Sequence, residues 1–249
     1  MRIPRIYINS LLTTGKKIQL DDRAYQHVIK VLRLRVDDKI IFFNDQTGEY
    51  PATLIEVSKK LAIAHIDSFD DNNTESPLAI HLALGISKGE RMDFAIQKAV
   101  ELGVSEITPL YTERCVVNLD SKREIKRLEH WQGVIISACE QSGRNILPKL
   151  HTPIDIRRNF GELPDYKLKL TLSPYATQSL KQIKKPDDEV LILIGPEGGL
   201  SEQEVQTAIQ HGFEAVRMGP RILRTETAAI TAISAIQMLW GDLGSISRN

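Results

Sequence analysis

The sequence has few cysteines and no excess of charge of either sign. Its 249 residues include two cysteines, and 32 acidic side chains balance 32 basic ones. Cys115 and Cys139 form no CxxC pair and have no histidine cluster near them, so neither a zinc site nor a disulfide framework is indicated, and we expect two buried thiols. Zero net charge excludes the overall basicity of many nucleic-acid-binding proteins, although a local basic patch stays possible.

Long apolar runs and the common nucleotide-binding signatures are also absent. No run approaches the roughly 20 residues that a membrane-spanning helix needs. The start, MRIPRIYINS, lacks the apolar core of a secretory signal, so a cytoplasmic protein is expected. Neither GxGxxG nor GxxxxGK[ST] occurs, which argues against the standard NAD and NTP sites. What remains is a globular chain, 42% hydrophobic and long enough for two domains.

A polar, acidic run at residues 67–77, DSFDDNNTESP, separates two halves of different character. Before it, the short β-rich runs RIYI, DKIIFF, YPATLIEV and LAIAHI surround one helical stretch, DRAYQHVIKVL, which predicts a small β-barrel domain over residues 1–70. After a linker at residues 71–77, strands alternate with helices. Residues 78–249 are therefore predicted to form an α/β domain with a parallel sheet covered by helices.

The stretch VLILIGPEGGLSEQE, residues 190–204, predicts a buried strand, a glycine-rich turn and a helix opened by a capping box of Ser201 and Glu204. Turns at the carboxyl ends of parallel strands are where α/β proteins bind ligands. Glu197 in the turn would repel a polyphosphate but would suit a neutral or cationic nucleoside such as S-adenosylmethionine. The alternative is an ordinary capped turn whose Glu197 faces solvent.

A second strand–turn–helix stretch is MGPRILRTETAAITAI, residues 218–233, with Arg221 and Arg224 just before a helix that begins near Thr225 and could be capped by a threonine. The two Gly-Pro turns are expected at one edge of the sheet, where they would form one pocket. The alternative is that these arginines are solvated or pair with Glu226. The helix itself is apolar nearly all round, which predicts a central position and contact with a second subunit.

The motifs GPEGG and GPRILRTETA, with ERMDFAIQKAVELGV, TERCVV and ACEQSGR upstream, resemble those of the bacterial ribosomal RNA small subunit methyltransferase E family. The resemblance spans essentially the whole chain, and only Leu200 departs from it, where an aromatic residue is expected. It implies N3-methylation of a uridine in 16S ribosomal RNA by S-adenosylmethionine. It also implies a PUA-like barrel, a SPOUT-type α/β domain threaded into a trefoil knot, and a homodimer with the active site at the interface.

Site residues follow from the resemblance by position. The implied cofactor contacts are Leu172, Ser173, Gly195, Pro196, Glu197, Gly198, Gly199, Met218, Gly219, Ile222, Leu223, Arg224, Thr225, Thr227 and Ala228. The implied contacts to ribosomal RNA are Arg33, Arg35, Arg114, Gln141 and Arg144. The pocket motifs contain no His/Cys/Asp cluster, so no metal is expected.

Methylation at N3 makes the base nitrogen the nucleophile, so no protein nucleophile is required. Arg224 is the candidate catalytic residue, because a fixed cation would stabilise the negative charge that spreads over the uracil ring; a structural role is the alternative. The general base stays open between hydroxide and a carboxylate such as Glu197. Rival hypotheses are a non-catalytic RNA-binding assembly factor, a nucleotide-dependent enzyme of another class, and a SPOUT methyltransferase that acts on another RNA.

Overall fold

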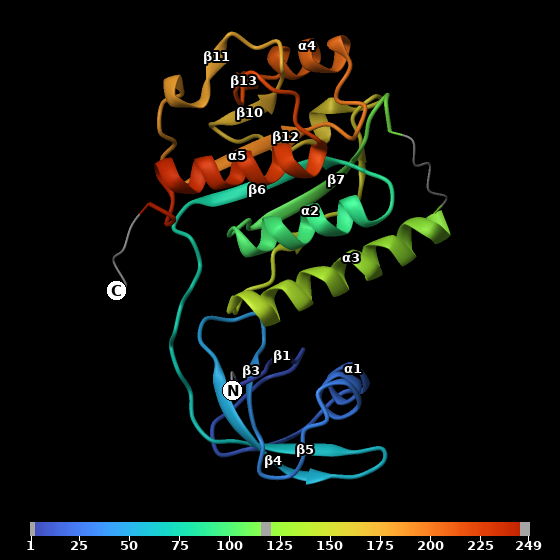
Figure 1. The fold of residues 1–249 in the computed structure, drawn as a ribbon, viewed down its shortest axis with the longest axis vertical. Helices are drawn as coiled ribbons and strands as arrows, with labels where there is room; N and C mark the ends of the chain where they lie inside the picture. The colour runs from blue at the N-terminus through green and yellow to red at the C-terminus, as the bar shows by residue number, and fades with distance from the viewer. Residues whose placement is uncertain (1–2, 116–120, 245–249) are drawn as a thin grey trace. The chain divides into compact units, whose positions relative to one another are not determined.

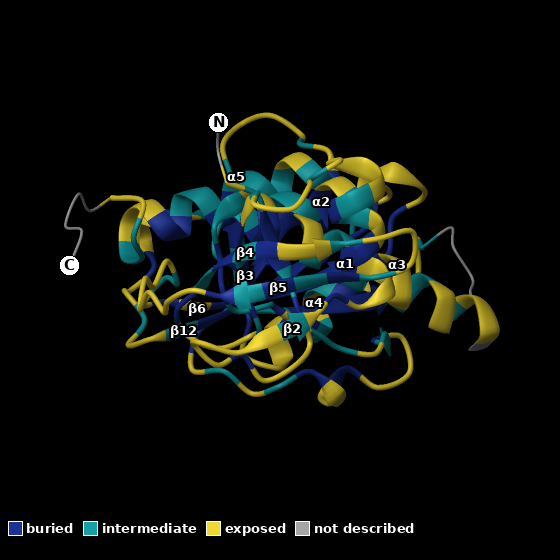
Figure 2. Ribbon diagram, turned by 90° about the horizontal axis from the view of Figure 1, so that it is seen from below, coloured by how far each residue is buried: buried dark blue, intermediate teal, exposed yellow. Residues whose placement is uncertain are grey.

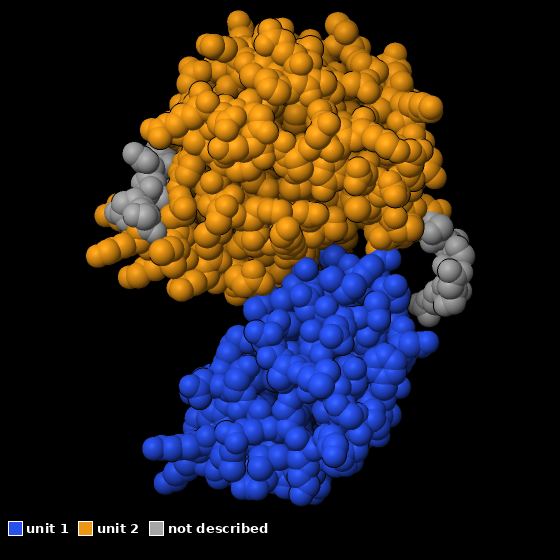
Figure 3. Space-filling view, turned by 180° about the vertical axis from the view of Figure 1, so that it is seen from behind, with its two compact units in different colours: residues 1–75, 136–147 blue, residues 76–135, 148–249 orange. Residues whose placement is uncertain are grey.

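The computed structural model describes residues 3–115 and 121–244. The described chain divides into two compact units, Met1–Glu75 with Ile136–Leu147, and Ser76–Ile135 with Pro148–Asn249 (Figure 3). The segment Ile136–Leu147, which the sequence pattern assigned to the α/β domain, thus belongs with the N-terminal unit. The last residues of the TERCVV motif, 116 and 117, lie outside the described residues.

The first unit is built on a five-stranded sheet, in which β1 runs parallel to β3 and the other neighbours are antiparallel. In sheet order the strands are β1 (Arg5–Tyr7), β3 (Lys39–Phe43), β4 (Tyr50–Val57), β5 (Ala62–Ile66) and β2 (Lys17–Gln19). The predicted helical stretch forms α1 (Asp22–Tyr25) followed by a π-helix at Gln26–Val31. Phe42, Leu54 and Val28 are fully buried in one apolar core, which holds the helical segment against the sheet.

The second unit contains an eight-stranded sheet whose paired strands are all parallel (Figure 1), which confirms the predicted α/β class. Its order is β11 (Gln178–Ser179), β13 (Glu214–Arg217), β10 (Lys169–Leu172), β12 (Glu189–Ile194), β6 (Ala79–Gly85), β7 (Glu106–Tyr111) and β8 (Lys149–Leu150), with β9 (Ile154–Asp155) also pairing with β7. The five longer strands were predicted from the sequence. The two-residue strands β8, β9 and β11 were not, because so short a run carries no hydrophobic alternation.

Helices cover both faces of this sheet. On one face, Ala208 of α4 (Glu202–Gln210) packs against Ala83, Leu191 and Leu193. The segment that holds the 3-10 turn Phe160–Glu162 packs into the same cluster. A second 3-10 turn is Leu180–Gln182. The alternate strand residues point to the opposite face, where α2 (Glu90–Glu101) and α5 (Thr225–Trp240) lie side by side (Figure 1). α3 (Ser121–Ser142) is the longest helix. None of the described helices is long and apolar enough to cross a membrane.

The buried residues are gathered in the strands and on the inner faces of the helices (Figure 2). Met92, Ile96 and Ala99 form the buried stripe of α2, and Gly103, at φ +84°, lies just beyond its end. Cys139 is buried as expected, and burial raises the pKa of its thiol to about 12. Cys115 is only half-buried, so the expectation of two buried thiols is wrong for that residue.

Candidate functional site at the carboxyl edge of the sheet

Three neighbouring strands, β13, β10 and β12, end at the same edge of the sheet. β10 lies between the other two, with Thr171 paired to Leu193 of β12 and Leu172 paired to Val216 of β13. Because the pairing is parallel, the turns that follow these strands leave the sheet together. They enclose a cavity of about 680 Å³, which is within the roughly 300–1,000 Å³ range of small-molecule sites. Both Gly-Pro turns line it, as predicted.

Most residues that the resemblance implied for cofactor binding line this cavity. They are Leu172, Ser173, Gly195, Pro196, Glu197, Gly198, Gly199, Met218, Gly219, Ile222, Leu223, Thr225 and Ala228. Arg224 and Thr227 do not line it. Sequence reasoning missed the contribution of α4, from which Val205, Gln206 and Ile209 reach the cavity, and that of Arg217 at the end of β13. These residues were missed because no motif in the sequence marks a helical face that lies opposite a glycine-rich turn.

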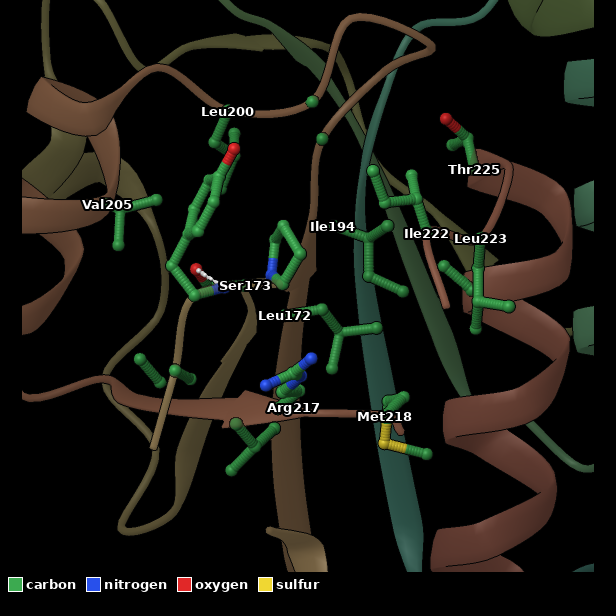
Figure 4. A pocket seen from close by; sticks show the side chains of 18 of the residues that line it. Leu172, Ser173, Ile194, Leu200, Val205, Arg217, Met218, Ile222, Leu223 and Thr225 are labelled. Atoms are coloured by element: carbon green, nitrogen blue, oxygen red, sulfur yellow. Dashed lines mark hydrogen bonds between the residues drawn. The ribbon is translucent and has the colours of Figure 1, made fainter. Parts of the chain in front are cut away.

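The cavity has apolar walls. In Figure 4 the side chains of Leu200 and Val205 lie on one side and those of Leu223 and Met218 on the other, with Ile194 between them. Two large lining side chains are mostly exposed, Tyr175 at 86% and Ile222 at 87%. Apolar surface that is both exposed and concave favours a ligand with a flat, partly apolar body, such as a nucleobase.

Two of the glycines that line the cavity have open space beside their backbone. Gly199 has φ +70° and Gly219 has φ +86°, and a Cβ added at either position would meet no protein atom within 4 Å. Glycine adopts such left-handed conformations at no steric cost. A bound molecule can therefore approach the main chain of both Gly-Pro turns.

The acidic residue of the first turn is held by the loop after β6. Glu197 Oε1 accepts the Lys88 backbone N–H at 2.9 Å and lies 3.3 Å from Arg91 Nη1. Burial opposes ionisation of this carboxyl, but the hydrogen bonds, chiefly that from the Lys88 N–H, and the Arg91 charge keep its pKa below the ordinary value. Glu197 is therefore a carboxylate at neutral pH. It lines the cavity and is at the same time bound to the loop after β6.

Glu204 joins the start of α4 to the loop after β7. Its Oε2 accepts the Ser201 N–H at 2.8 Å, which completes the predicted capping box, and its Oε1 accepts the Glu113 N–H at 2.8 Å. The next residue, Arg114, lines the cavity and donates from Nη1 to the Gly198 carbonyl at 2.9 Å. One buried carboxylate thus holds a second loop over the glycine-rich turn. The capping box was predicted, but its partner Glu113 was not.

The second turn differs from its prediction in the cap of α5. The N-cap residue is Arg224, with φ −66° and ψ 156°, and no side chain caps the helix, so the expectation that a threonine caps it is wrong. Within the described chain, the exposed Arg224 side chain has no ion-pair partner, and neither Arg221 nor Arg224 pairs with Glu226. Arg221 lines the cavity.

The residues implied for RNA contacts differ in exposure. Arg33, Arg35, Arg114 and Gln141 are exposed. Arg144 is buried, and its guanidinium donates from Nε to both carboxylate oxygens of Glu75 at 3.1 Å. An RNA contact by Arg144 would have to break this pair.

Away from the cavity, the fold assembles a group that could hold a metal ion. His81, Glu106 and His151 each offer one ligand atom, and these atoms all lie within 4.8 Å of one another. Burial lowers the pKa of His81 to about 4, so this imidazole is neutral at neutral pH. No metal was expected, because the pocket motifs contain no His/Cys/Asp cluster. His81, Glu106 and His151 are far apart along the chain and come together only through strand pairing, so no pattern in the sequence indicates this group.

Comparison with known proteins identifies the family. The model of the RNA methyltransferase domain matches residues 74–237, and that of the RNA methyltransferase PUA domain matches residues 20–67. A ribosomal RNA small subunit methyltransferase E of Buchnera aphidicola is 42% identical over 97% of this chain and 98% of its own. The chain belongs to the ribosomal RNA small subunit methyltransferase E family. The Bacillus subtilis member is 32% identical over 87% of this chain and 89% of its own.

Solved structures agree with this family. The enzyme of this family from Neisseria gonorrhoeae, bound to S-adenosyl methionine, superimposes with a TM-score of 0.90 at 43% identity, covering 97% of this chain and all of that one. A methyltransferase from Legionella pneumophila in complex with SAM gives a TM-score of 0.93 at 44% identity, covering 98% and 100%. The SPOUT-type α/β domain after a PUA domain is thus confirmed, while the trefoil knot stays a prediction.

The Glu204 bridge yields a test that needs no ligand. Glu204→Ala should lower the free energy of unfolding by about 1–2 kcal/mol, because it removes a capping box and leaves the Glu113 N–H without its acceptor. Hydrogen exchange at the Glu113 amide should accelerate in the same variant. Glu202→Ala, a change in the exposed first turn of the same helix, is the matched control. Unchanged Glu113 exchange in Glu204→Ala would show that the bridge does not hold the loop in solution.

Proposed function

We propose that this protein transfers a methyl group from S-adenosylmethionine to N3 of one uridine in 16S ribosomal RNA, in the cytoplasm where ribosomes assemble. The main support is the cavity at the carboxyl edge of β13, β10 and β12. It is lined by the two Gly-Pro motifs, which lie within the residues that the RNA methyltransferase model matches. Support also comes from two relatives, at 43% and 44% identity, that were solved with this cofactor bound.

The cavity suits this cofactor chemically. S-adenosylmethionine, when bound, supplies an electrophilic methyl group on a sulfonium. We propose that the apolar walls, including Leu172 and Leu223, hold its adenine and that the open backbone of Gly199 and Gly219 contacts its polar parts. Arg114, Arg217 and Arg221 line the cavity beside Glu197 and Glu202, so both signs of charge are available for a zwitterionic amino acid moiety.

Among the residues outside the cavity wall, Arg224 is the candidate for catalysis. Its side chain is exposed at the start of α5, next to the lining residues Leu223 and Thr225, so it can reach a base presented to the cavity mouth. Uridine N3 must lose its proton as it attacks, and the resulting charge spreads to the ring oxygens. A guanidinium beside those oxygens stabilises the transition state, which typically contributes about 3–4 kcal/mol. The base that takes the proton stays open between hydroxide and Glu197.

RNA binding is proposed for exposed basic and polar groups of each unit. In the first unit these are Arg33, Arg35 and Gln141, and in the second unit Arg114, which also lines the cavity. Phosphate contacts by such groups weaken as salt rises, because binding releases counterions. We leave Arg144 out of the proposed interface, because its guanidinium is buried against Glu75.

A homodimer is proposed from the surface of α5. One side of the helix is buried against its own unit through Ala229, Ala232 and Ile233, while Met238 and Leu239 at its end are 61% and 44% exposed. Exposed apolar side chains at the end of a helix this apolar favour contact with a second copy of the chain.

Cofactor binding is tested by calorimetry with S-adenosylmethionine and with ATP. The protein should bind the first and not the second. Gly199→Ala should weaken binding roughly tenfold or more, about 1.4 kcal/mol, because Gly199 lines the cavity and a methyl group there would occupy open space that a ligand in contact with the turn would need. Gly15→Ala is the matched control, since Gly15 also has φ +80° and open space around its Cβ but does not line the cavity. Equal loss of cofactor affinity in both variants would mean that backbone strain, and not the cavity, is responsible. If the parent protein binds no S-adenosylmethionine, the hypothesis of a non-catalytic assembly factor is favoured.

Catalysis by Arg224 is tested with small-subunit particles that lack the modification. Arg224→Ala should keep cofactor affinity while the single-turnover rate of methyl transfer falls roughly a hundredfold or more, the scale for one transition-state donor. Arg224→Lys should restore only part of the rate, because an ammonium lacks the planar fork of a guanidinium. Arg158→Ala, at an exposed arginine outside the cavity lining, is the control. A parental rate in Arg224→Ala would make this arginine structural, and a methyl found on any atom other than N3 by nucleoside mass spectrometry would refute the proposed position.

The dimer is tested by light scattering at micromolar concentration. The parent should have twice the mass of one chain, and the double variant Met238→Glu with Leu239→Glu should have the mass of one, because two buried carboxylates cost more than the contact gains. Ile125→Glu, at a 58% exposed position on α3, is the control and should keep the parental mass. A monomeric parent contradicts the proposal.

A further inference from the structure

The group His81, Glu106 and His151 lies at the opposite end of the sheet from the cavity. His81 is near the start of β6, Glu106 is the first residue of β7, and His151 follows β8 directly. His81 and Glu106 are register partners in neighbouring parallel strands, so their side chains project from the same face. The His151 N–H donates to the Ile107 carbonyl at 2.9 Å, which fixes its backbone next to β7.

The ligand atoms of the three side chains converge. Glu106 Oε2 lies 2.5 Å from His151 Nε2 and 3.9 Å from His81 Nδ1. The two imidazole rings stack with centroids 5.2 Å apart and planes 12° apart. In a tetrahedral zinc site with bonds of about 2.0–2.2 Å, ligand atoms are separated by roughly 3.3 Å. The observed distances bracket this value, and the partly exposed Glu106 and His151 side chains can make the small adjustment by rotation.

A buried hydroxyl orients His81. Its Nε2 lies 2.8 Å from Thr108 Oγ1, and both residues are 1% exposed. When Nε2–H donates to Thr108, the lone pair of the ring is on Nδ1, the nitrogen nearer to Glu106. Metal-ligating histidines almost always donate their other N–H to such an acceptor, which fixes the tautomer and the ring orientation. The Tyr166 hydroxyl lies 3.2 Å from Nδ1, so without an ion it can donate a hydrogen bond to this lone pair. With an ion bound, the same hydroxyl could serve as a fourth ligand or turn away from the site.

The geometry points to a metal site: we propose that His81, Glu106 and His151 bind one Zn²⁺ ion, with water or the Tyr166 hydroxyl as the fourth ligand. Two imidazoles and one carboxylate are a ligand set that zinc uses in proteins. The partial exposure of Glu106 and His151, at 33% and 27% of their side chains, leaves a route of entry for the ion. The site is independent of the proposed methyl transfer, because it lies at the amino ends of β6 and β7.

The consequence of binding is structural. The three ligands come from β6, β7 and the residue after β8, so one ion would cross-link three neighbouring strands at the edge where β8 has only two residues. An ion that binds the folded chain stabilises it in proportion to the logarithm of its concentration over its dissociation constant. A simple ion pair between His151 and Glu106 is the alternative, and it requires no contribution from His81.

The test uses the full chain, with any affinity tag removed and bound metal stripped by a chelator. Calorimetry and thermal unfolding with Zn²⁺ should give one ion per chain and a raised Tm. His151→Gln and Glu106→Gln should each weaken binding at least roughly tenfold, the scale found even for residues outside the ligand set. His130→Gln is the matched control, because His130 also pairs with a carboxylate, Asp93 at 2.7 Å, but belongs to no such group in the described chain.

Co²⁺ gives a second readout, since a tetrahedral site with nitrogen and oxygen ligands has visible absorption bands without the thiolate bands that Cys115 or Cys139 would add. Affinity for S-adenosylmethionine should stay at the parental value in His151→Gln. The proposal is overturned if the parent binds no Zn²⁺ at micromolar concentration, or if His151→Gln and Glu106→Gln bind it as the parent does. Neither of these outcomes bears on the methyltransferase activity, and failure to bind the cofactor would not bear on the zinc site.

Discussion

The parallel pairing of β10 with both β12 and β13 is the constraint on which the candidate site depends. Along the chain the three strands come in the order β10, β12, β13, yet in the sheet β10 lies between the other two. Their carboxyl ends therefore meet at one edge, and the residues after each strand enter the same space. The Gly-Pro turns, Arg217 and the first residues of α5 become neighbours only because of this order.

Local signals in the sequence predicted local structure well, and they failed where distant segments meet. The capping box of Ser201 and Glu204 was predicted because its two hydrogen bonds join residues three apart. The bond from Glu113 to the same carboxylate spans 91 residues and has no pattern in the sequence. The group of His81, Glu106 and His151 escaped prediction for the same reason. Arg144 shows the converse case: its motif implied an RNA contact, whereas the structure buries its guanidinium against Glu75, 69 residues away, and the sequence has no pattern for that pairing.

The acidic turn illustrates how a charge can satisfy two requirements. Glu197 was predicted either to balance a cationic ligand or to face solvent, but its carboxylate first accepts the N–H of Lys88 in the loop after β6. That bond ties two neighbouring strand ends together and keeps the carboxylate ionised, since charged acceptors bind N–H groups more strongly than neutral ones. Its position in the cavity lining still leaves a negative charge near any bound ligand. A glutamine could accept the same hydrogen bond but would lose this charge.

The start of α5 carries a similar compromise between stability and chemistry. A serine, threonine or asparagine at the N-cap would typically stabilise a helix by about 1 kcal/mol relative to a residue without a capping oxygen. The chain has Arg224 there, and no side chain caps the helix. The first N–H groups of α5 and the guanidinium of Arg224 thus both present positive charge beside the cavity, where Thr225 and Ala228 line the wall. A capping hydroxyl would remove the cation and satisfy one of the free N–H donors. The terminus without a side-chain cap therefore keeps both the N–H groups and the guanidinium available to a negative charge near the cavity, which supports the role proposed for Arg224.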